Sequence, residues 1–286
     1  MDDQPTPLSS LGQLRAQIDA IDDQIHDLLM RRALVVEEVA HDAGKGGTKI
    51  RPGREARILR RLLGRHAGSL PAQAITRFWR EMFAAALIIE GGQTIAVSDG
   101  EGGADRLALA REHFGPLTPM RRHHNPAQTL ADVARESAQV AVLPEPGEDD
   151  ESEGGWWTAL TATGARRLHV IAKIPFWTRR AEGSPQGSAL VVAGIRPDAS
   201  GADKTLVVLE LKGDTSRTRV ITLLKDAGFT PGQIWMRRVP GDLAVHALVE
   251  LDGFLEEDDP RLGAISGQGG RPVVIGSFAV PLGEGV

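Results

Sequence analysis

The sequence predicts a multidomain protein of the α plus α/β class, and three observations support this. The first forty residues carry an apolar stripe at spacings of three and four, which is typical of a long helix that packs against other helices. After Gly91-Gly92, short apolar runs alternate with helical patterns, as in α/β segments. From residue 203 the expected elements follow the order βαββαβ. We predict a helical domain at 8–91, a small central α/β lobe at 92–196 and a ferredoxin-like domain at 203–280.

Composition narrows the classes of function. The chain of 286 residues has a formal net charge of −5 and no basic tract, so nucleic acid is not an expected partner. It has no cysteine, which excludes disulfides, thiolate nucleophiles and cysteine-bound metal. We find neither a signal peptide nor an apolar run long enough for a membrane. We therefore expect a cytoplasmic protein that has no membrane partner.

The first predicted helix follows Ser10, which stands at capping-box spacing from Gln13, and ends near His41. At about 1.5 Å per residue it spans roughly 50 Å, too long to be covered by the two short helices that follow. We therefore predict a homodimer formed through this helix. Its stripe consists of Leu11, Leu14, Ile18, Ile21, Ile25, Leu28, Arg32, Val35 and Val39.

The next two helices are shorter. One begins at Pro52 and stops near Gly64, and the other runs from Ser69-Leu70-Pro71 to about Ile89. Their apolar faces are expected to be Ile58, Leu59, Leu62 and Leu63 in one and Ile75, Phe78, Trp79, Met82, Phe83 and Ala86 in the other.

The remaining elements are predicted from short apolar runs and turn residues. The acidic run at 147–155 is expected to be a solvated loop. Trp156-Trp157, which follow it, are expected to fill the core of the middle domain or an interface. His123-His124 lie in an expected polar connection and lack the ligand spacing of a metal site. In chain order the expected elements are strand 94–98, helix 104–114, helix 129–136, strands 139–143, 168–174, 189–193 and 205–211, helix 217–227, strands 233–237 and 243–251, a helical stretch at 256–265 and strand 272–278.

Arg32 is the polar member of the first stripe. A guanidinium there costs several kcal/mol unless it is paired, so Arg32 either binds an anion or forms a structural ion pair. With Arg15, Arg54 and Glu55 it suits a small ligand with two carboxylates and a hydroxyl, because arginine binds carboxylates bidentately. Solvated helix faces are the expected places for other basic residues, namely Arg31, Arg57, Arg60 and Arg61.

Several short motifs resemble the all-helical chorismate mutase family over roughly residues 8–90. They are Leu14-Arg15, Ile21-Asp22, Leu28-Leu29-Met30-Arg31-Arg32, Arg54-Glu55 and Ile75-Thr76-Arg77-Phe78-Trp79. The resemblance implies an intertwined helical dimer that rearranges chorismate to prephenate. It also implies that Arg15 clamps a carboxylate in the partner's site, that Arg32 and Arg54 hold carboxylates in the same chain, and that Glu55 takes the ring hydroxyl.

The chain departs from that family where charge would face the ether oxygen. The family lysine falls at Asp42 or Ala43, and the nearest lysine is Lys45, a candidate donor beyond Gly44. The family glutamine falls at Glu90, which can donate only if protonated, a state that burial favours and a nearby guanidinium opposes. Where the family has an aspartate in the second helix, this chain has Arg51, and where it has a serine in the last helix, this chain has Ala86.

The later segments resemble two further families. The opening Thr94-Ile-Ala-Val-Ser-Asp-Gly and the run Gln139-Val-Ala-Val-Leu-Pro-Glu-Pro resemble one lobe of prephenate dehydratase. The family's Thr-Arg-Phe motif falls at Ser188-Ala189-Leu190, so we expect no dehydratase activity. The last segment has the shape of an ACT domain, whose amino-acid effector is a candidate partner, and a plain dimerisation domain of that fold is the alternative.

These observations predict a chorismate mutase, an isomerase of the shikimate route to phenylalanine and tyrosine that needs no cofactor or metal. Two alternatives stay open. The chain is a non-catalytic chorismate-binding or regulatory protein if it has lost the charge at the ether oxygen. The sequence favours a bifunctional mutase and dehydratase least, because of Ser188-Ala189-Leu190.

Overall fold

The computed structural model describes residues 10–42, 49–100, 103–147, 154–162, 167–238 and 244–283. The chain divides into two compact units. One contains helix α1 (Leu11–Asp42) and residues 89–91, and the other contains the remaining helices and all the described strands. The domain limits 8–91, 92–196 and 203–280 stay predictions.

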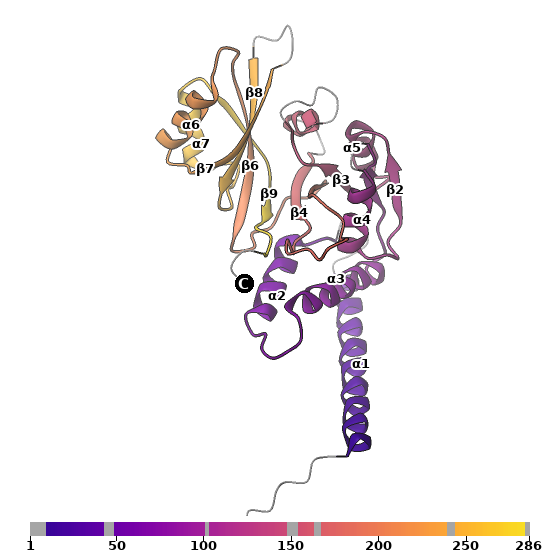
Figure 1. Cartoon of the computed structure of the whole chain (residues 1–286). Helices are drawn as coiled ribbons and strands as arrows, with labels where there is room; N and C mark the ends of the chain where they lie inside the picture. Colours follow the sequence, from indigo (N-terminus) through magenta and orange to yellow (C-terminus); the bar gives the residue numbers. More distant parts are fainter. Residues whose placement is uncertain are drawn as a thin grey trace, which may run out of the picture. The chain divides into compact units, whose positions relative to one another are not determined.

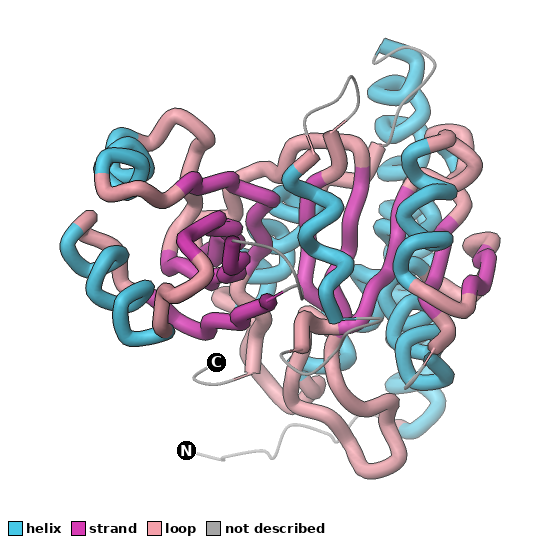
Figure 2. The backbone as a smooth tube through the Cα atoms, turned by 90° about the horizontal axis from the view of Figure 1, so that it is seen from above, coloured by secondary structure: helices cyan, strands magenta, loops and turns pink. Residues whose placement is uncertain are grey.

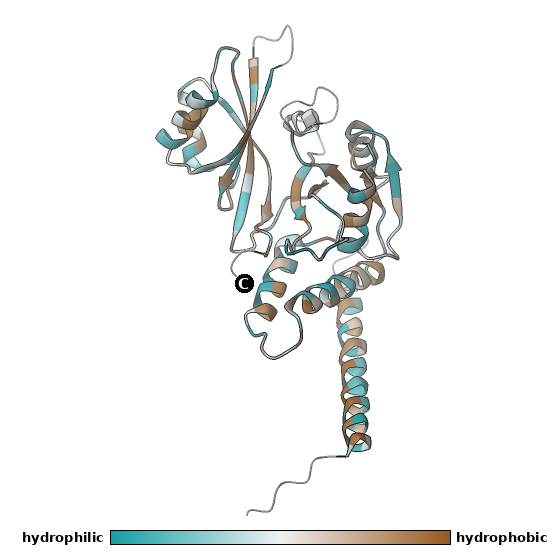
Figure 3. Cartoon of the chain, viewed as in Figure 1, coloured by the Kyte–Doolittle hydropathy of each residue, from teal (hydrophilic) through white to brown (hydrophobic). Residues whose placement is uncertain are grey.

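Helix α1 begins and ends within a residue of the predicted bounds. The capping box is confirmed, because the Ser10 N–H donates to Gln13 Oε1 at 2.8 Å and the Gln13 N–H donates to Ser10 Oγ at 3.3 Å. None of its residues is buried in the single chain. The apolar members of the predicted stripe are 44–64% exposed, and apolar residues recur along the whole helix (Figure 3). Arg32 itself is half-buried.

Helices α2 (Pro52–Leu63) and α3 (Ala72–Ile89) pack in the second unit. Pro52 occupies the first helical position of α2, as predicted. The two helices share a core with the segment that follows β4 and with the end of β9. This core contains Ala56, Leu59, Leu63, Phe83, Phe176, Trp177, Ala279 and Leu282.

The described strands form one mixed nine-stranded sheet in the order β2-β1-β3-β5-β4-β9-β6-β8-β7 (Figure 1). Strand β1 runs parallel to β2 and β3, and β4 pairs in parallel with β9 through a single bridge. The other pairs are antiparallel. The strands are β1 (Ile95–Ser98), β2 (Met120–His123), β3 (Val140–Pro144), β4 (His169–Ile174), β5 (Ala189–Ala193), β6 (Asp203–Lys212), β7 (Pro231–Arg238), β8 (Ala244–Asp252) and β9 (Arg271–Ala279).

Helices cover the sheet on both sides (Figure 2). Helix α4 (Gly103–Phe114) packs on one face of the first strands, and α5 (Pro126–Ala134) with the 3-10 helix η1 (Gly154–Thr161) packs on the other. Helices α6 (Arg217–Asp226) and α7 (Pro260–Gly267) cover one face of the last four strands. The order β9-β6-β8-β7 with these two helices confirms the predicted βαββαβ segment.

The two α/β segments, expected as separate domains, share this sheet. At the bridge between them, Val170 faces Gly276, whose φ is +141°. A Cβ added to Gly276 would lie 2.1 Å from the Val170 carbonyl oxygen, so only glycine allows the backbones to approach this closely. The core that contains Trp156 and Trp157 also extends from β3 to β8, which confirms that both tryptophans fill the core.

Two elements were not predicted. His123 lies in edge strand β2, not in a polar connection, and its Nε2 lies 2.8 Å from Asp132 Oδ2. Edge strands often carry charged side chains. Because of Arg121 and Arg122, this strand lacks the apolar run from which the other strands were predicted. The second is the 3-10 helix η1. Most of the predicted acidic loop before it lies outside the described residues.

No described helix combines the length and apolar character needed to span a bilayer.

Candidate active site

Two of the predicted clamp residues lie on α1. Arg15 is exposed and Arg32 is half-buried. They are seventeen positions apart, which corresponds to about 26 Å along a helix. One small dicarboxylate therefore cannot touch both guanidiniums of the same α1.

The other two lie next to each other in the first turn of α2. The Arg54 side chain is exposed and Glu55 is half-buried. Arg80 of α3 donates to Glu55 Oε2 at 2.6 Å, and the two side chains are only 9% and 12% exposed. Glu55 is thus held by a buried ion pair, which fixes its side chain before any ligand arrives.

Arg80 was not predicted from the sequence. Its guanidinium carbon lies 5.7 Å from the ring centre of Phe83 and 5.4 Å from that of Phe176. Burial lowers the pKa of Arg80, and the charge and hydrogen bond of Glu55 oppose that change. The sequence does contain a signal for an inward-facing arginine. Arg80 stands three or four positions from the other buried residues of α3, which are Thr76, Phe83 and Ala84, and therefore lies on the same face of the helix.

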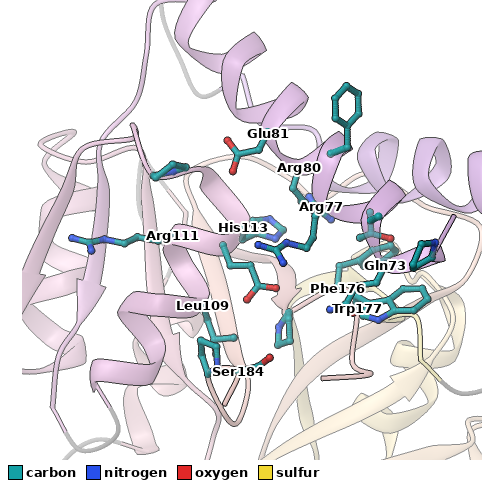
Figure 4. Close-up of a pocket in the computed structure, with 18 residues that line it drawn as sticks. Gln73, Arg77, Arg80, Glu81, Leu109, Arg111, His113, Phe176, Trp177 and Ser184 are labelled. Atoms are coloured by element: carbon teal, nitrogen blue, oxygen red, sulfur yellow. The ribbon is translucent and has the colours of Figure 1, made fainter. Parts of the chain in front are cut away.

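A cleft of about 870 Å³ lies between α3, α4 and the segment 175–185. Arg77 and Arg80 extend into it from α3, with His113 beside them and the aromatic side chains of Phe176 and Trp177 along one wall (Figure 4). Burial, together with the charge of Arg80, lowers the pKa of His113 well below its usual value. His113 is therefore neutral at neutral pH.

The prediction that Arg60 lies on a solvated face was wrong. Its Nη1 donates to the carbonyl oxygen and to Oγ of Ser200 at 3.1 and 2.8 Å. Its Nη2 donates to the carbonyl oxygens of Ala202 and Val280, each at 2.9 Å. Its guanidinium carbon lies 5.7 Å from the ring centre of Phe176. This arginine therefore joins α2 to the segment before β6 and to the end of β9.

Of the two predicted donors to the ether oxygen, the structure describes Glu90 and not Lys45. Glu90 follows directly after the last residue of α3 and is half-buried. Lys45 and Ala43 lie outside the described residues. Ala86 is half-buried on α3, and Arg51 is exposed immediately before α2.

The residues expected at the place of the dehydratase motif, 188–190, lie beside a polar cluster. Glu145, after β3, pairs with Lys173 of β4 and accepts a hydrogen bond from Ser188. Burial opposes ionisation of Glu145, yet these partners leave its pKa below the usual value. Ala189 and Leu190 follow as buried members of β5. The one hydroxyl at this motif is therefore bound to a carboxylate.

Within the described ranges, no three histidine or acidic side chains converge in a way that could hold a metal ion.

Comparisons with known proteins place the helical part of the chain in a family. Residues 14–91 match the family model of chorismate mutase type II, so the N-terminal part of the chain is a domain of this family. The match includes Arg15, Arg32, Arg54, Glu55 and Glu90.

Curated relatives extend the similarity beyond this domain. The bifunctional chorismate mutase/prephenate dehydratase of Neisseria gonorrhoeae is 31% identical over 186 residues, which are 62% of this chain and 49% of that protein. The protein of the same description from Pseudomonas aeruginosa is 30% identical over 138 residues, 46% of this chain and 36% of that one. The chain thus spans about half the length, or less, of these relatives.

Solved structures of prephenate dehydratases are also similar. The one from Streptococcus mutans aligns with a TM-score of 0.47 and 13% identity, over 66% of this chain and 98% of that one. The one from Arthrobacter aurescens, in complex with L-Phe, aligns with a TM-score of 0.46 and 15% identity, over 65% and 90% of the two chains.

Proposed function

We propose that the chain is a chorismate mutase of aromatic amino acid biosynthesis. The observation that carries this proposal is that Arg15, Arg32, Arg54 and Glu55 all fall within the matched residues 14–91. Guanidiniums suit the two carboxylates of chorismate, and the fixed Glu55 carboxylate suits its hydroxyl.

The reaction needs positioning more than chemical groups. In the Claisen rearrangement the ether C–O bond breaks while a C–C bond forms within the same molecule, so no nucleophile, electron or water enters. A site that holds both carboxylates restrains the substrate near its reactive conformation. A donor placed against the ether oxygen stabilises the negative charge that develops there.

The site as proposed takes Arg15 from a second copy of the chain. Because Arg15 and Arg32 of one α1 are about 26 Å apart, one substrate can reach both only if another α1 runs alongside. The exposed apolar stripe of α1 gives that second helix a surface to pack on, since a stripe of this size is rarely left in water.

We expect the full chain to be a dimer in solution. Analytical ultracentrifugation at low micromolar concentration should give twice the chain mass of 30.6 kDa. Replacing Ile21 and Ile25, both in the stripe, with aspartate should give monomers and abolish turnover. A wild-type chain that is active as a monomer would contradict the role of Arg15.

Glu90 is the proposed donor to the ether oxygen. A carboxyl group donates only when it is protonated, so turnover should fall as pH rises and Glu90 loses its proton. The variant Glu90→Gln should remove this alkaline loss, because an amide donates at every pH. The measurement is kcat against pH for both proteins. An unchanged alkaline loss in the Gln variant would assign the donor elsewhere, with Lys45 as the next candidate.

We also propose that the chain has no dehydratase activity. Supporting this, Ser188 is engaged with Glu145, and Glu145 with Lys173. The βαββαβ segment, β6 to β9, is proposed to be ACT-like, with an amino acid as its effector.

The rival function is chorismate binding without catalysis, which is favoured by Ala86 and by Ala43 at the position of the family lysine. Calorimetric titration with chorismate, combined with an assay of its consumption, separates the two. An enzyme consumes chorismate during the titration, whereas a binding protein gives a saturable heat with no loss of chorismate. A chain that does neither would contradict both proposals.

A further inference from the structure

Helix α2 has no cap of its own. Its N-cap residue is Arg51, whose side chain makes no capping hydrogen bond and has no acceptor to offer. The free N–H groups of the first turn are instead bound by Asp198, which lies in the linker between β5 and β6. Gly53 N–H donates to Asp198 Oδ1 at 2.9 Å, and Arg54 N–H donates to Asp198 Oδ2 at 3.1 Å. A carboxylate nearly 150 positions away thus replaces the missing local cap.

The sequence of α2 is adapted to this contact. A Cβ on Gly53 would lie 2.0 Å from the Asp198 carbonyl oxygen and 2.9 Å from its Cγ. The first turn and the linker backbone therefore approach each other at a distance that only glycine permits.

Charge reinforces the contact. The Asp198 side chain is 24% exposed, and its Oδ2 lies 3.7 Å from Arg51 Nε and 3.9 Å from Arg57 Nη2. Its negative charge also lies at the positive end of the α2 dipole. In the described part of the chain, Asp198 meets Arg54 only through the backbone, so the exposed Arg54 guanidinium stays available to a ligand.

The same linker also contacts the last turn of α2. Arg60 donates to Ser200 and Ala202, and the Ser200 N–H and hydroxyl are in turn bound by the Asp203 carboxylate. Residues 198–203 are therefore ordered by their own hydrogen bonds and contact α2 at two points along its length.

We propose that Asp198 is a positioning residue for the chorismate site. By capping α2 it fixes the backbone of Arg54, and it ties that clamp to the linker that leads into the C-terminal βαββαβ segment. The inference rests on the proposed function, in which Arg54 holds a substrate carboxylate. A change in the linker then alters the mutase site without any contact between the C-terminal segment and the substrate.

Steady-state kinetics of the full chain test this. Asp198→Ala should raise KM for chorismate about tenfold with kcat changed less than about threefold, because a carboxylate contact made in both ground and transition states is weakened. Asp198→Asn retains one acceptor and should give an intermediate KM. Gly53→Ala should raise KM like Asp198→Ala, because it disrupts the same contact while retaining the charge. The control is Asp226→Ala, at an exposed aspartate at the end of α6, which should match the wild type.

All variants are compared at a temperature at which circular dichroism shows them folded, and chorismate affinity is measured by calorimetry as a second readout. A merely structural cap would lower the melting temperature and leave KM unchanged in folded protein, which would overturn the proposal. A lower KM in both Asp198 variants, with no effect of Gly53→Ala, would also overturn the proposal. It would show that the negative charge of Asp198 repels the substrate and that its cap on α2 has no effect on binding. A wild type that neither converts nor binds chorismate would overturn the proposed function itself, whereas an active wild type with an unaffected Asp198→Ala would overturn this inference alone.

Discussion

Replacing Arg32 with alanine is expected to lower kcat/KM for chorismate at least about a hundredfold. A charged hydrogen bond to a substrate carboxylate contributes roughly 2–4 kcal/mol of transition-state binding, and alanine removes all of it. Arg32 is half-buried on the apolar stripe of α1, so alanine fits both the helix and the stripe. We expect the melting temperature and the mass of the dimer to be retained. The measurement is steady-state turnover of the purified variant.

The neighbouring Arg31 provides the matched control. It is exposed on α1, and Arg31→Ala should leave kcat/KM within about twofold of the wild type. Unfolding of the Arg32 variant would show that Arg32 is part of a structural ion pair. Equal losses in both variants would show that general charge, and not the position of Arg32, attracts the substrate.

The replacement of Arg80 by methionine is expected to destabilise the chain by roughly 3–5 kcal/mol. Removing one partner of a buried ion pair leaves the other charge uncompensated, and that cost exceeds the net contribution of the intact pair. Here the carboxylate that loses Arg80 would be Glu55, whose side chain is 12% exposed. The free energy of unfolding is obtained from equilibrium unfolding in urea.

The double variant separates the charge from the packing. Adding Glu55→Gln to Arg80→Met removes the buried negative charge that has lost Arg80 and should restore part of the lost stability. Arg77→Met, on the exposed side of the same helix, should change stability by less than about 0.5 kcal/mol. If Arg80→Met is as stable as the wild type, the ion pair with Arg80 does not hold Glu55 in its position.

The long helix could be predicted because its determinants are local. The stripe spacing and the Ser10–Gln13 box lie within the helix, so the bounds of α1 were correct to within a residue. Strands β6, β8 and β9 were found for the same reason, since their apolar runs are buried almost completely.

The contacts that organise the site could not be predicted, because each joins residues far apart in the sequence. Arg60 and Arg61 look alike on α2, yet only Arg60 meets the carbonyl groups before β6 and after β9. The cap on α2 comes from Asp198, and no local pattern points to it. Of these residues, Arg80 could have been identified from a local pattern, because it occurs at the spacing of the buried face of α3.

The pairing of the two α/β segments in one sheet could not be predicted from the sequence either. Nothing in the run around Gly276 distinguishes it from other glycines until Val170 is brought against it by the fold. The pairing of the two α/β segments across β4 and β9 depends on this close backbone approach, which the sequence pattern of neither segment contains.

The most direct test of the proposed function is to incubate the purified full chain with chorismate and to follow chorismate, prephenate and phenylpyruvate in the same sample. We predict that chorismate is consumed, that prephenate accumulates in equal amount, and that phenylpyruvate does not rise above the level formed without protein. Persistence of chorismate at the uncatalysed rate would contradict a catalytic mutase, and enzyme-dependent phenylpyruvate would contradict the loss of dehydratase activity.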